Sequence, residues 1–288
     1  MNLLGQCRDK FSGKKKFRFK NKLVSLDSSI IDLSPSLFDW AKFRRTKGAI
    51  KLHLILDHDG YLPSFAVITE GNVSDVKVAH QLSFDSGTIV VDDRGYNDYA
   101  LFGKWTAQGV YFVTRMKNNT LYAVVKEQEM PKNGYILKDE IVHLAGTKAD
   151  EKCPHPLRRI EVYNPEKDEI LVFLTNNMKF GATTIAAIYK DRWQIELFFK
   201  ALKQNLKIKT FVGTSANAVK IQIWTALIAV LILKYLQLNS AFAWSLSNLV
   251  ALLRMNLFTH RDIWAWLDKP FEIPPVPYEQ KQLKLNFT

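Results

Sequence analysis

The order of strand-like and helix-like runs in the first 115 residues is the feature that most limits how this chain can fold. Three strand-like runs come first, and an Asp-Gly pair between the second and third is a strong hairpin signal. Helix and strand then alternate, which predicts an α/β fold with a mixed sheet flanked by helices. The runs cover residues 17–31, 48–57, 61–71, 72–82, 88–91, 97–108 and 110–115.

The fourth strand-like run is short and apolar, and two acids follow it directly. Residues 88–91 read TIVV, and Asp92, Asp93 and an Arg-Gly turn come next. A central buried strand of an α/β sheet delivers residues to its carboxyl end in this way. Because adjacent strand residues point to opposite faces, at most one of Asp92 and Asp93 can face a site there.

The pattern changes after residue 116. Short strand-like pieces separated by turn clusters fill residues 117–178, without a convincing helix, and predict a β-rich insertion. A separate small β domain is the less favoured alternative, because a long helix returns directly afterwards. The predicted division is a basic N-terminal segment, the first part of a core, the insertion, the rest of the core with its helices, and a Pro-rich tail, at 1–16, 17–116, 117–180, 181–268 and 269–288.

The charge balance favours an anionic partner. Lys and Arg outnumber Asp and Glu by 40 to 28, for a formal charge of +12, and DNA, RNA and acidic lipid all fit such an excess. The basic residues gather in three separate places, at residues 14–22, 42–51 and 200–209. Three clusters on different elements favour a broad anionic ligand over an ordinary solubilising surface.

Cysteine content and hydropathy indicate a cytoplasmic protein with no membrane partner. Neither Cys7 nor Cys153 lies in a CxxC or Cys/His cluster, which gives no support for a disulfide framework or a zinc site. The N-terminus lacks the apolar core of a signal peptide. The most apolar segment, residues 221–233, falls short of the roughly 20 residues that span a bilayer. It predicts a buried helix.

Residues 188–204 predict one two-sided helix. Apolar residues at helical spacing form a face for burial, and four polar residues at intervals of three, four and seven return to one side: Tyr189, Arg192, Glu196 and Lys203. The ordinary interpretation of that polar side is a solvated surface with an i, i+4 ion pair worth a few tenths of a kcal/mol. Spacing alone does not decide between that interpretation and a functional one.

Three carboxylates stand out by position: Asp27 at the predicted end of the first strand, Asp92 or Asp93, and Glu196. Hard divalent cations prefer oxygen ligands, and two such ions can support phosphoryl transfer. The alternatives are a turn or cap role for Asp27, and loop acids neutralised by Arg94. With 28 acids in the chain, spacing alone cannot choose between these.

A resemblance to a known family bears on this choice. The spacing Tyr-x2-Arg-x3-Glu-x6-Lys, realised here as Tyr189, Arg192, Glu196 and Lys203, resembles the signature of bacterial insertion-sequence transposases of the insertion sequence four group, within the DDE superfamily. The segments LDSSIIDLSPSLFDWAKFRRTKGAIKLH, ITEGNVSDV, VDDRGYNDYALF and LTNN resemble the same group in the same order. The similarity extends from about residue 23 to about residue 230.

The resemblance implies a ribonuclease-H-like core with a β-rich insertion and with Asp27, Asp93 and Glu196 as the catalytic, metal-binding acids. In such enzymes the acids bind two divalent ions, usually Mg²⁺ with Mn²⁺ able to substitute. An activated water cuts a strand at the transposon end, and the freed 3′-hydroxyl attacks target DNA. His53, Lys51 and Asp75 are expected near this site, and His53 is expected to be an ordinary hydrogen-bonded strand histidine.

The resemblance also implies double-stranded DNA, as transposon ends and target, for the partner. The expected DNA contacts are Tyr189, Arg192 and Lys203, joined by the basic residues Lys200, Lys207, Arg44 and Arg45. It implies a homodimer in the DNA complex and action at the bacterial nucleoid.

One departure from the family pattern raises alternatives. Members usually carry a helical DNA-binding region before the first Asp, and only 26 residues precede Asp27 here. A catalytically incompetent DNA-binding fragment or inhibitor is therefore the second hypothesis. A repair or ribonuclease-type nuclease on the same core is the third, and it does not explain Tyr189, Arg192 and Lys203 together.

Overall fold

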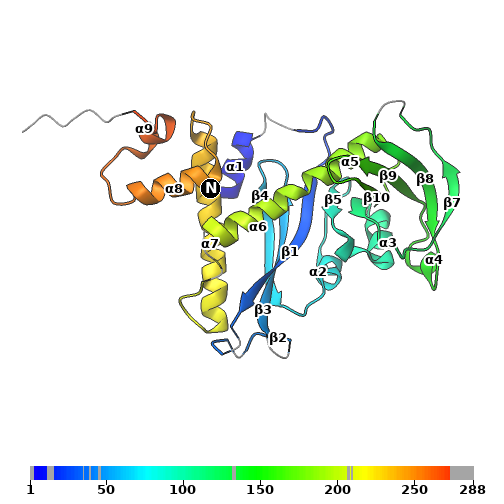
Figure 1. Ribbon diagram of the computed structural model, residues 1–288, viewed down its shortest axis with the longest axis horizontal. Helices are drawn as coiled ribbons and strands as arrows, with labels where there is room; N and C mark the ends of the chain where they lie inside the picture. Colours follow the sequence, from blue (N-terminus) through cyan, green and yellow to red (C-terminus); the bar gives the residue numbers. More distant parts are fainter. Residues whose placement is uncertain are drawn as a thin grey trace, which may run out of the picture.

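The computed structural model describes residues 3–11, 16–34, 36–38, 40–44, 47–131, 134–205, 208 and 210–272, and within them ten strands form one mixed sheet (Figure 1). Across the sheet the order is β2-β3-β1-β5-β6-β10-β9-β8-β7, and β4 also pairs with β3. The strands are β1 Leu23–Leu33, β2 Lys42–Arg44, β3 Lys47–Asp57, β4 Leu62–Glu70, β5 Ile89–Asp92, β6 Tyr111–Arg115, β7 Tyr122–Glu127, β8 Ile136–Leu144, β9 Leu157–Asn164 and β10 Glu169–Thr175.

The central strands have the predicted ribonuclease-H-like arrangement. β4, β3 and β1 are antiparallel neighbours, whereas β1, β5 and β6 run parallel. Parallel neighbours need crossover connections, and helices supply them. The helices are α1 Leu3–Phe11, α2 Asp75–Gln81, the 3₁₀ turn η1 Arg94–Tyr96, α3 Tyr99–Ala107, α4 Ala149–Lys152, α5 Ala182–Asp191, α6 Trp193–Asn205, α7 Ala216–Asn239, α8 Leu246–Asn256 and α9 Ile263–Asp268.

Different helices cover the two faces of the sheet, because alternate strand residues point to opposite sides. One face packs against α2 and α3 through a core that includes Val24, Val90 and Phe112. The other packs against α5 through a core that includes Leu23 and Val91. Farther along β1 and β3, α6 and α7 cover this second face. Each fully buried large apolar side chain contributes roughly 1.5–3 kcal/mol.

The strands of the predicted β-rich insertion, β7 to β10, continue the same sheet, because β10 pairs antiparallel with β6. The expectation that this stretch has no helix is wrong at α4, Ala149–Lys152. A helix of four residues is too short to produce a helical repeat of apolar residues, and α4 begins after Lys148 in the left-handed region, at φ 60°.

Two predicted boundaries in the catalytic half are wrong. Asp27 does not end the first strand: β1 continues to Leu33, and Asp27 pairs with Leu54 in its middle. The two serines after Asp27 suggest a turn, but β3 is long enough to pair with the whole of β1. The second error is the single helix at residues 188–204, which is two helices, α5 and α6, separated at Arg192.

The last two described helices begin at side chains that cap them. Ser245 accepts a hydrogen bond from the amide of Asn248 at the start of α8, and Asp262 accepts two at the start of α9. Residues 273–288, most of the predicted tail, lie outside the described residues.

The long helix α7 is apolar enough, by length and composition, to cross a membrane. One side of it is packed into the protein, however. Val219, Ile223, Ala226, Leu227 and Val230 are buried in the core that it shares with α6 and β3, and α1 packs beside it. The prediction of a buried helix is correct for that side only, because Ile221, Trp224, Ile228 and Ile232 on α7 are 45–56% exposed.

Candidate active site

Strand register brings two of the predicted acids together. In the parallel pair β1–β5, Ser25 lies opposite Val91. Asp27 lies two residues after Ser25, and Asp93 lies two residues after Val91. A step of two residues returns each side chain to the same face of the sheet. Adjacent strands lie about 4.8 Å apart. Asp27 and Asp93 point to the face of the sheet that α5 and α6 cover. Glu196 lies on α6.

Asp92 and Asp93 have opposite environments. The Asp92 side chain is completely buried, and burial raises its pKa well above the usual range, against the smaller lowering effect of the Thr114 hydroxyl. Asp93 is partly exposed and accepts a hydrogen bond from the Gly95 amide at 2.7 Å, which caps the 3₁₀ turn η1. A carboxyl held in its protonated form is a poor metal ligand, so the exposed neighbour is the better candidate.

Arg192 occupies the space between two of the acids. Its Nη1 donates to Asp27 Oδ2 at 3.0 Å, and its Nη2 donates to Glu196 Oε1 at 2.5 Å. Only 12% of the Arg192 side chain is exposed, and its guanidinium lies 5.6 Å from the ring centre of Tyr189. The i, i+4 ion pair considered from the sequence therefore exists, but it is part of a partly buried three-residue bridge that includes Asp27.

The pKa of Asp27 is raised mainly by burial and, to a smaller degree, by neighbouring negative charge. Burial raises it to about 7, Arg192 opposes the rise, and the carboxylates of Asp93 and Glu196 add to it. The amide of Ser28, which donates to Asp27 Oδ1 at 2.7 Å, lowers it slightly. Three carboxylates thus influence one another with a single arginine between them, and a set of oxygen donors short of positive charge fits hard divalent cations.

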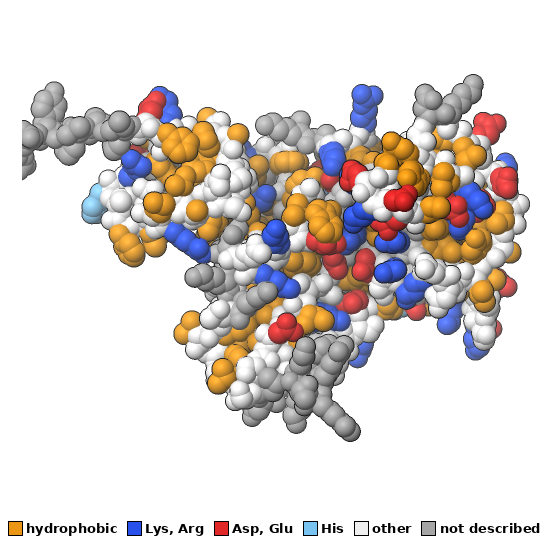
Figure 2. Space-filling model, viewed as in Figure 1, with side chains coloured by type: hydrophobic (Ala, Val, Ile, Leu, Met, Phe, Trp, Pro, Cys, Tyr) orange, Lys and Arg blue, Asp and Glu red, His pale blue; other side chains and the backbone are white. Residues whose placement is uncertain are grey.

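The acids are near one another without being gathered into a ready metal site. Among the described residues, no three acidic, histidine or cysteine side chains converge in a way that could hold one ion. Arg192 lies between Asp27 and Glu196, so both must turn away from the guanidinium to ligate a metal. Figure 2 shows acidic and basic side chains mixed near the middle of this face.

Other predicted site residues have varied environments. Tyr189 packs against Phe173 with ring centres 4.6 Å apart, and Lys203 donates to the carbonyl oxygen of Ile30 at 2.8 Å. Lys200 is exposed. Arg45, Lys207 and the side chain of Arg44 lie outside the part of the chain that the structure describes. The role of all six in DNA binding stays a prediction.

A second polar group stands beside Asp27. Asp75, at the start of α2, accepts a hydrogen bond from Ser28 Oγ at 2.7 Å and pairs with Lys51 Nζ at 3.2 Å. His53 lies 3.5 Å from the same carboxylate and hydrogen-bonds Thr69 at 2.9 Å. Burial lowers the pKa of His53 to about 4, so the ring is neutral. The group lies on the opposite face of β1 from the Asp27 side chain. His53 within it is a hydrogen-bonded strand histidine, as the sequence predicts.

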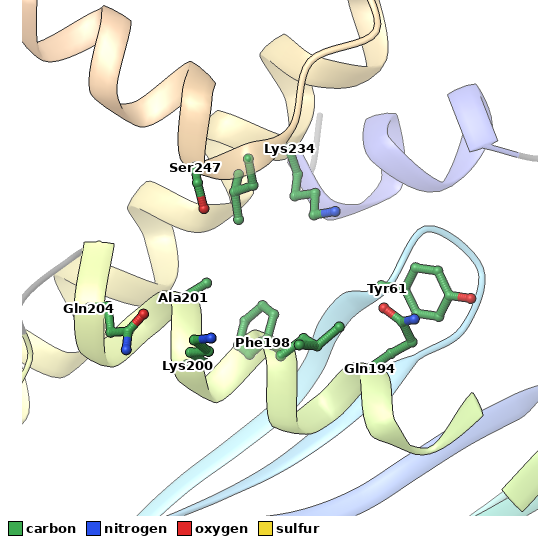
Figure 3. Close-up of a pocket in the computed structure, with 10 residues that line it drawn as sticks. Tyr61, Gln194, Phe198, Lys200, Ala201, Gln204, Lys234 and Ser247 are labelled. Carbon is green, nitrogen blue, oxygen red and sulfur yellow. The ribbon is translucent and has the colours of Figure 1, made fainter. Parts of the chain in front are cut away.

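A cavity of about 320 Å³ lies on another side of α6, between that helix, α7 and α8 (Figure 3). Its walls include Phe198, Lys200, Gln204 and Lys234, and the ring of Tyr61 stands at one end. None of the three acids lines it. The chemistry of the acids and the cavity are therefore separate features of the same helix.

The comparisons with known proteins agree with the geometry. The family described as "Transposase DDE domain" matches residues 18–232. A Sinorhizobium fredii protein named as transposase y4zB is 36% identical over 257 residues, which are 87% of this chain and 70% of that one. A Geobacillus stearothermophilus protein named as a transposase for insertion sequence element IS5377 is 28% identical over 77% of this chain and 59% of its own length.

Two further similarities are more distant. A Synechocystis protein named as a transposase for insertion sequence element IS4SA is 27% identical over 75% of this chain and 60% of its own length. A solved structure of the piggyBac transposase synaptic complex with hairpin DNA aligns with a TM-score of 0.48 at 10% identity, over 88% of this chain and 54% of that one. The chain thus spans between 59% and 70% of the length of these three curated relatives. By the family match and the first of these relatives, the chain belongs to the DDE transposases of bacterial insertion sequences, whose function is DNA transposition.

Proposed function

We propose that this chain cuts DNA at the ends of its insertion sequence and joins the freed 3′-hydroxyl to target DNA, with Asp27, Asp93 and Glu196 as the catalytic acids. The observation that carries the proposal is the register of β1 and β5, which sets Asp27 beside Asp93 on the face that α6 covers with Glu196. The raised pKa of Asp27 adds that all three carboxylates share one electrostatic environment.

The three acids would hold two divalent ions, Mg²⁺ or Mn²⁺. Such ions, when bound, supply the positive charge that activates an attacking oxygen and stabilises a leaving one. The chain's own contribution is the placement of the carboxylates on two rigid strands and one helix. The Lys51–Asp75–Ser28 group lies next to Asp27 and ties β1 to β3 and to the start of α2.

Arg192 has two roles in this proposal. Without metal it neutralises Asp27 and Glu196, which would otherwise repel each other in a buried setting. If divalent ions supplied that neutralising charge, the guanidinium could bind a DNA phosphate through two parallel hydrogen bonds. Tyr189, Lys203 and Lys200 would extend this contact along the same helix pair, and Lys207, Arg44 and Arg45 are proposed as further DNA contacts from the sequence alone.

DNA binding by this surface would be strongly salt-dependent, because phosphate contacts release counterions. The partner is duplex DNA, first the element's own ends and then the target, and the active complex is a homodimer at the bacterial nucleoid. The relatives that are named as transposases are longer than the part of them that this chain matches. Cleavage by this chain itself is therefore the point to test.

The test compares cleavage of duplexes that carry the element's ends, with Mg²⁺ or Mn²⁺, by the wild type and by Asp93→Asn and Glu196→Gln. When catalytic residues act as one unit, removal of one of them lowers the rate of the enzyme by roughly 10³-fold or more. The control is Glu166→Gln, which removes an exposed acid paired with Lys190 and should leave the rate unchanged. Equal nicking by all four proteins would exclude the assignment.

A further inference from the structure

A buried carboxylate, Asp191, joins distant parts of the chain at the break between α5 and α6. His58 Nδ1 lies 2.6 Å from Asp191 Oδ2, and Lys16 Nζ lies 2.5 Å from Oδ1. The hydroxyl of Tyr61 donates to the same carboxylate at 3.2–3.3 Å. On the far side of the imidazole, His58 Nε2 lies 2.7 Å from Ser25 Oγ. The hydrogen-bond chain therefore runs from β1 through the β3–β4 turn to the end of α5.

Because this network is buried, each of its polar groups needs a hydrogen-bond partner within the protein. Asp191 is 2% exposed, Ser25 is fully buried, and His58 is 8% exposed. A buried carboxylate is costly unless it is paired and hydrogen-bonded, so its partners must be in place whenever the chain is folded. These partners lower the pKa of Asp191 despite its burial. The hydrogen bonds from Asp191 through His58 to Ser25 thus fix the position of Asp191 relative to β1.

Ser25, His58 and Asp191 have the connectivity of a hydrolytic triad, but the geometry excludes that function. Ser25 lies inside β1, between its partners β3 and β5, and none of its surface reaches solvent. No substrate carbonyl could approach its Oγ. The three residues therefore hold structure together and do not form a second reaction centre.

The helix break occurs where this network is attached. The amide of Arg192 donates to the carbonyl of Tyr189 at 3.1 Å, and the amide of Ile195 donates to the carbonyl of Arg192 at 3.0 Å. These i to i+3 bonds tighten the turn between two α-helices. α5 belongs to the core over β5 and β6, and α6 to the core over β1 and β3. Asp191 fixes the point at which the chain passes from one core to the other.

The network reaches the acid site at both ends. Asp191 directly precedes Arg192, which bridges Asp27 and Glu196. Ser25 is two residues before Asp27, on the same face of β1. We propose that Asp191 and His58 are positioning residues that set the rotation of α6 against β1, and thereby the position of Glu196 relative to Asp27. The catalytic meaning of this inference rests on the function proposed above.

The test measures position directly and needs no metal. Amide hydrogen exchange in the first turn of α6, residues 193–197, is compared in the wild type, Asp191→Asn and His58→Gln. We expect exchange there to be at least about tenfold faster in both variants, because an unanchored turn opens more often. The matched control is Asp139→Asn, which breaks another buried carboxylate pair, with Arg158 in the insertion. Five strand spacings, about 24 Å, separate it from β1.

A second readout is Mn²⁺ affinity of the DNA-free protein, followed by the electron paramagnetic resonance signal of free Mn²⁺. Loss of residues that orient ligands typically costs 10–100-fold in metal affinity, so Asp191→Asn and His58→Gln should weaken binding by about that factor, while Asp139→Asn should not. Unchanged exchange in α6 for both variants would overturn the positioning role. Absence of Mn²⁺ binding by the wild type would instead count against the proposed function, and exchange would still decide the positioning role.

If Asp191→Asn does not fold, Tyr61→Phe supplies a milder change, since it removes only the longest of the three contacts to the carboxylate. Its expected effect is a two- to threefold acceleration of exchange in the same turn, with the helical circular dichroism unchanged. Exchange at the wild-type rate in Tyr61→Phe and His58→Gln together would show that the turn is held by packing alone.

Discussion

Two buried charge clusters in this molecule differ in how completely they are paired. In the insertion, Arg158 makes two parallel bonds to Asp139 at 2.7 and 2.6 Å. Its neighbour Arg159 binds both Glu140 and Glu161, and the Arg159 guanidinium also lies 4.9 Å from the ring centre of Tyr122. In the acid site, one arginine, Arg192, bonds both Asp27 and Glu196, and Asp93 is a third acid whose charge acts on Asp27.

This difference in charge pairing indicates that the two clusters have different roles. A buried carboxylate that has its own arginine is a structural element, because the pair satisfies both charges and both sets of hydrogen bonds. Asp27 has no arginine of its own, because Arg192 also bonds Glu196. Burial, with a smaller contribution from the charges of Asp93 and Glu196, raises the pKa of Asp27 and marks an electrostatic penalty in the folded state. Such a penalty persists where function requires it, and a bound cation would relieve it.

The largest effect that distinguishes the clusters is expected at Asp139. Asp139→Asn leaves Arg158 buried without its anion, and breaking a buried pair typically costs about 3–5 kcal/mol of unfolding free energy. Urea denaturation measures this. The double variant Asp139→Asn with Arg158→Met should recover part of the loss, because no buried charge is then left alone. A single variant as stable as the wild type would refute a structural role for the pair.

A second effect is expected at His53, a buried group that is kept neutral. Its pKa in the folded state is lowered to about 4 from an ordinary value of 6.5. The fold therefore favours the neutral ring: its stability contribution is fully present above about pH 6.5 and is lost as the pH falls towards 4. The total is about 3 kcal/mol of unfolding free energy.

His53→Gln, which keeps a polar partner for Thr69, should remove much of this acid sensitivity in unfolding curves recorded between pH 7 and 4. His80→Gln is the matched control, at a side chain that is 37% exposed. If the stability of His53→Gln falls with pH as steeply as that of the wild type, then the acid sensitivity has another origin.

The central sheet could be predicted for a physical reason, whereas the choice of Asp27 with Asp93 rested on the family resemblance. Strand residues alternate between two faces, and parallel strands meet in a regular register, so short patterns such as TIVVDD carry enough information to place an acid. The preference for Asp93 over Asp92 came from a family motif. The exposure of these two residues now gives it a physical basis, because Asp92 is buried and Asp93 is not.

The break at Arg192 could not be predicted, because its cause is remote in sequence. Asp191 and His58 are 133 residues apart, and no helical repeat reveals that a polar residue will be buried against a distant turn. The extension of β1 past Asp27 has a similar origin, since it depends on the length of β3. The position of Arg192 between two acids followed from neither spacing nor motif, as both indicated only a shared side of a helix.

An effect of the opposite sign is expected at Asp27. Its folded pKa, about 7, lies above its ordinary value of 3.8, so the protonated form is favoured by the fold. Its stability contribution is fully present below about pH 3.8 and is lost as the pH rises towards 7. Asp27→Asn mimics the protonated form at every pH, and should be more stable than the wild type at neutral pH by about 4 kcal/mol.

Thermal unfolding with a chelator present, at pH 4 and at pH 7.5, measures the difference. The two proteins should be alike at pH 4 and should separate at pH 7.5, whereas Asp139→Asn should be less stable than the wild type at both. A divalent ion should narrow the gap by stabilising only the wild type, because a ligand that binds the native state adds to its stability. If Asp27→Asn were destabilised to the same degree at both pH values, Asp27 would be fully paired by Arg192, and the distinction between the two charge clusters would fail.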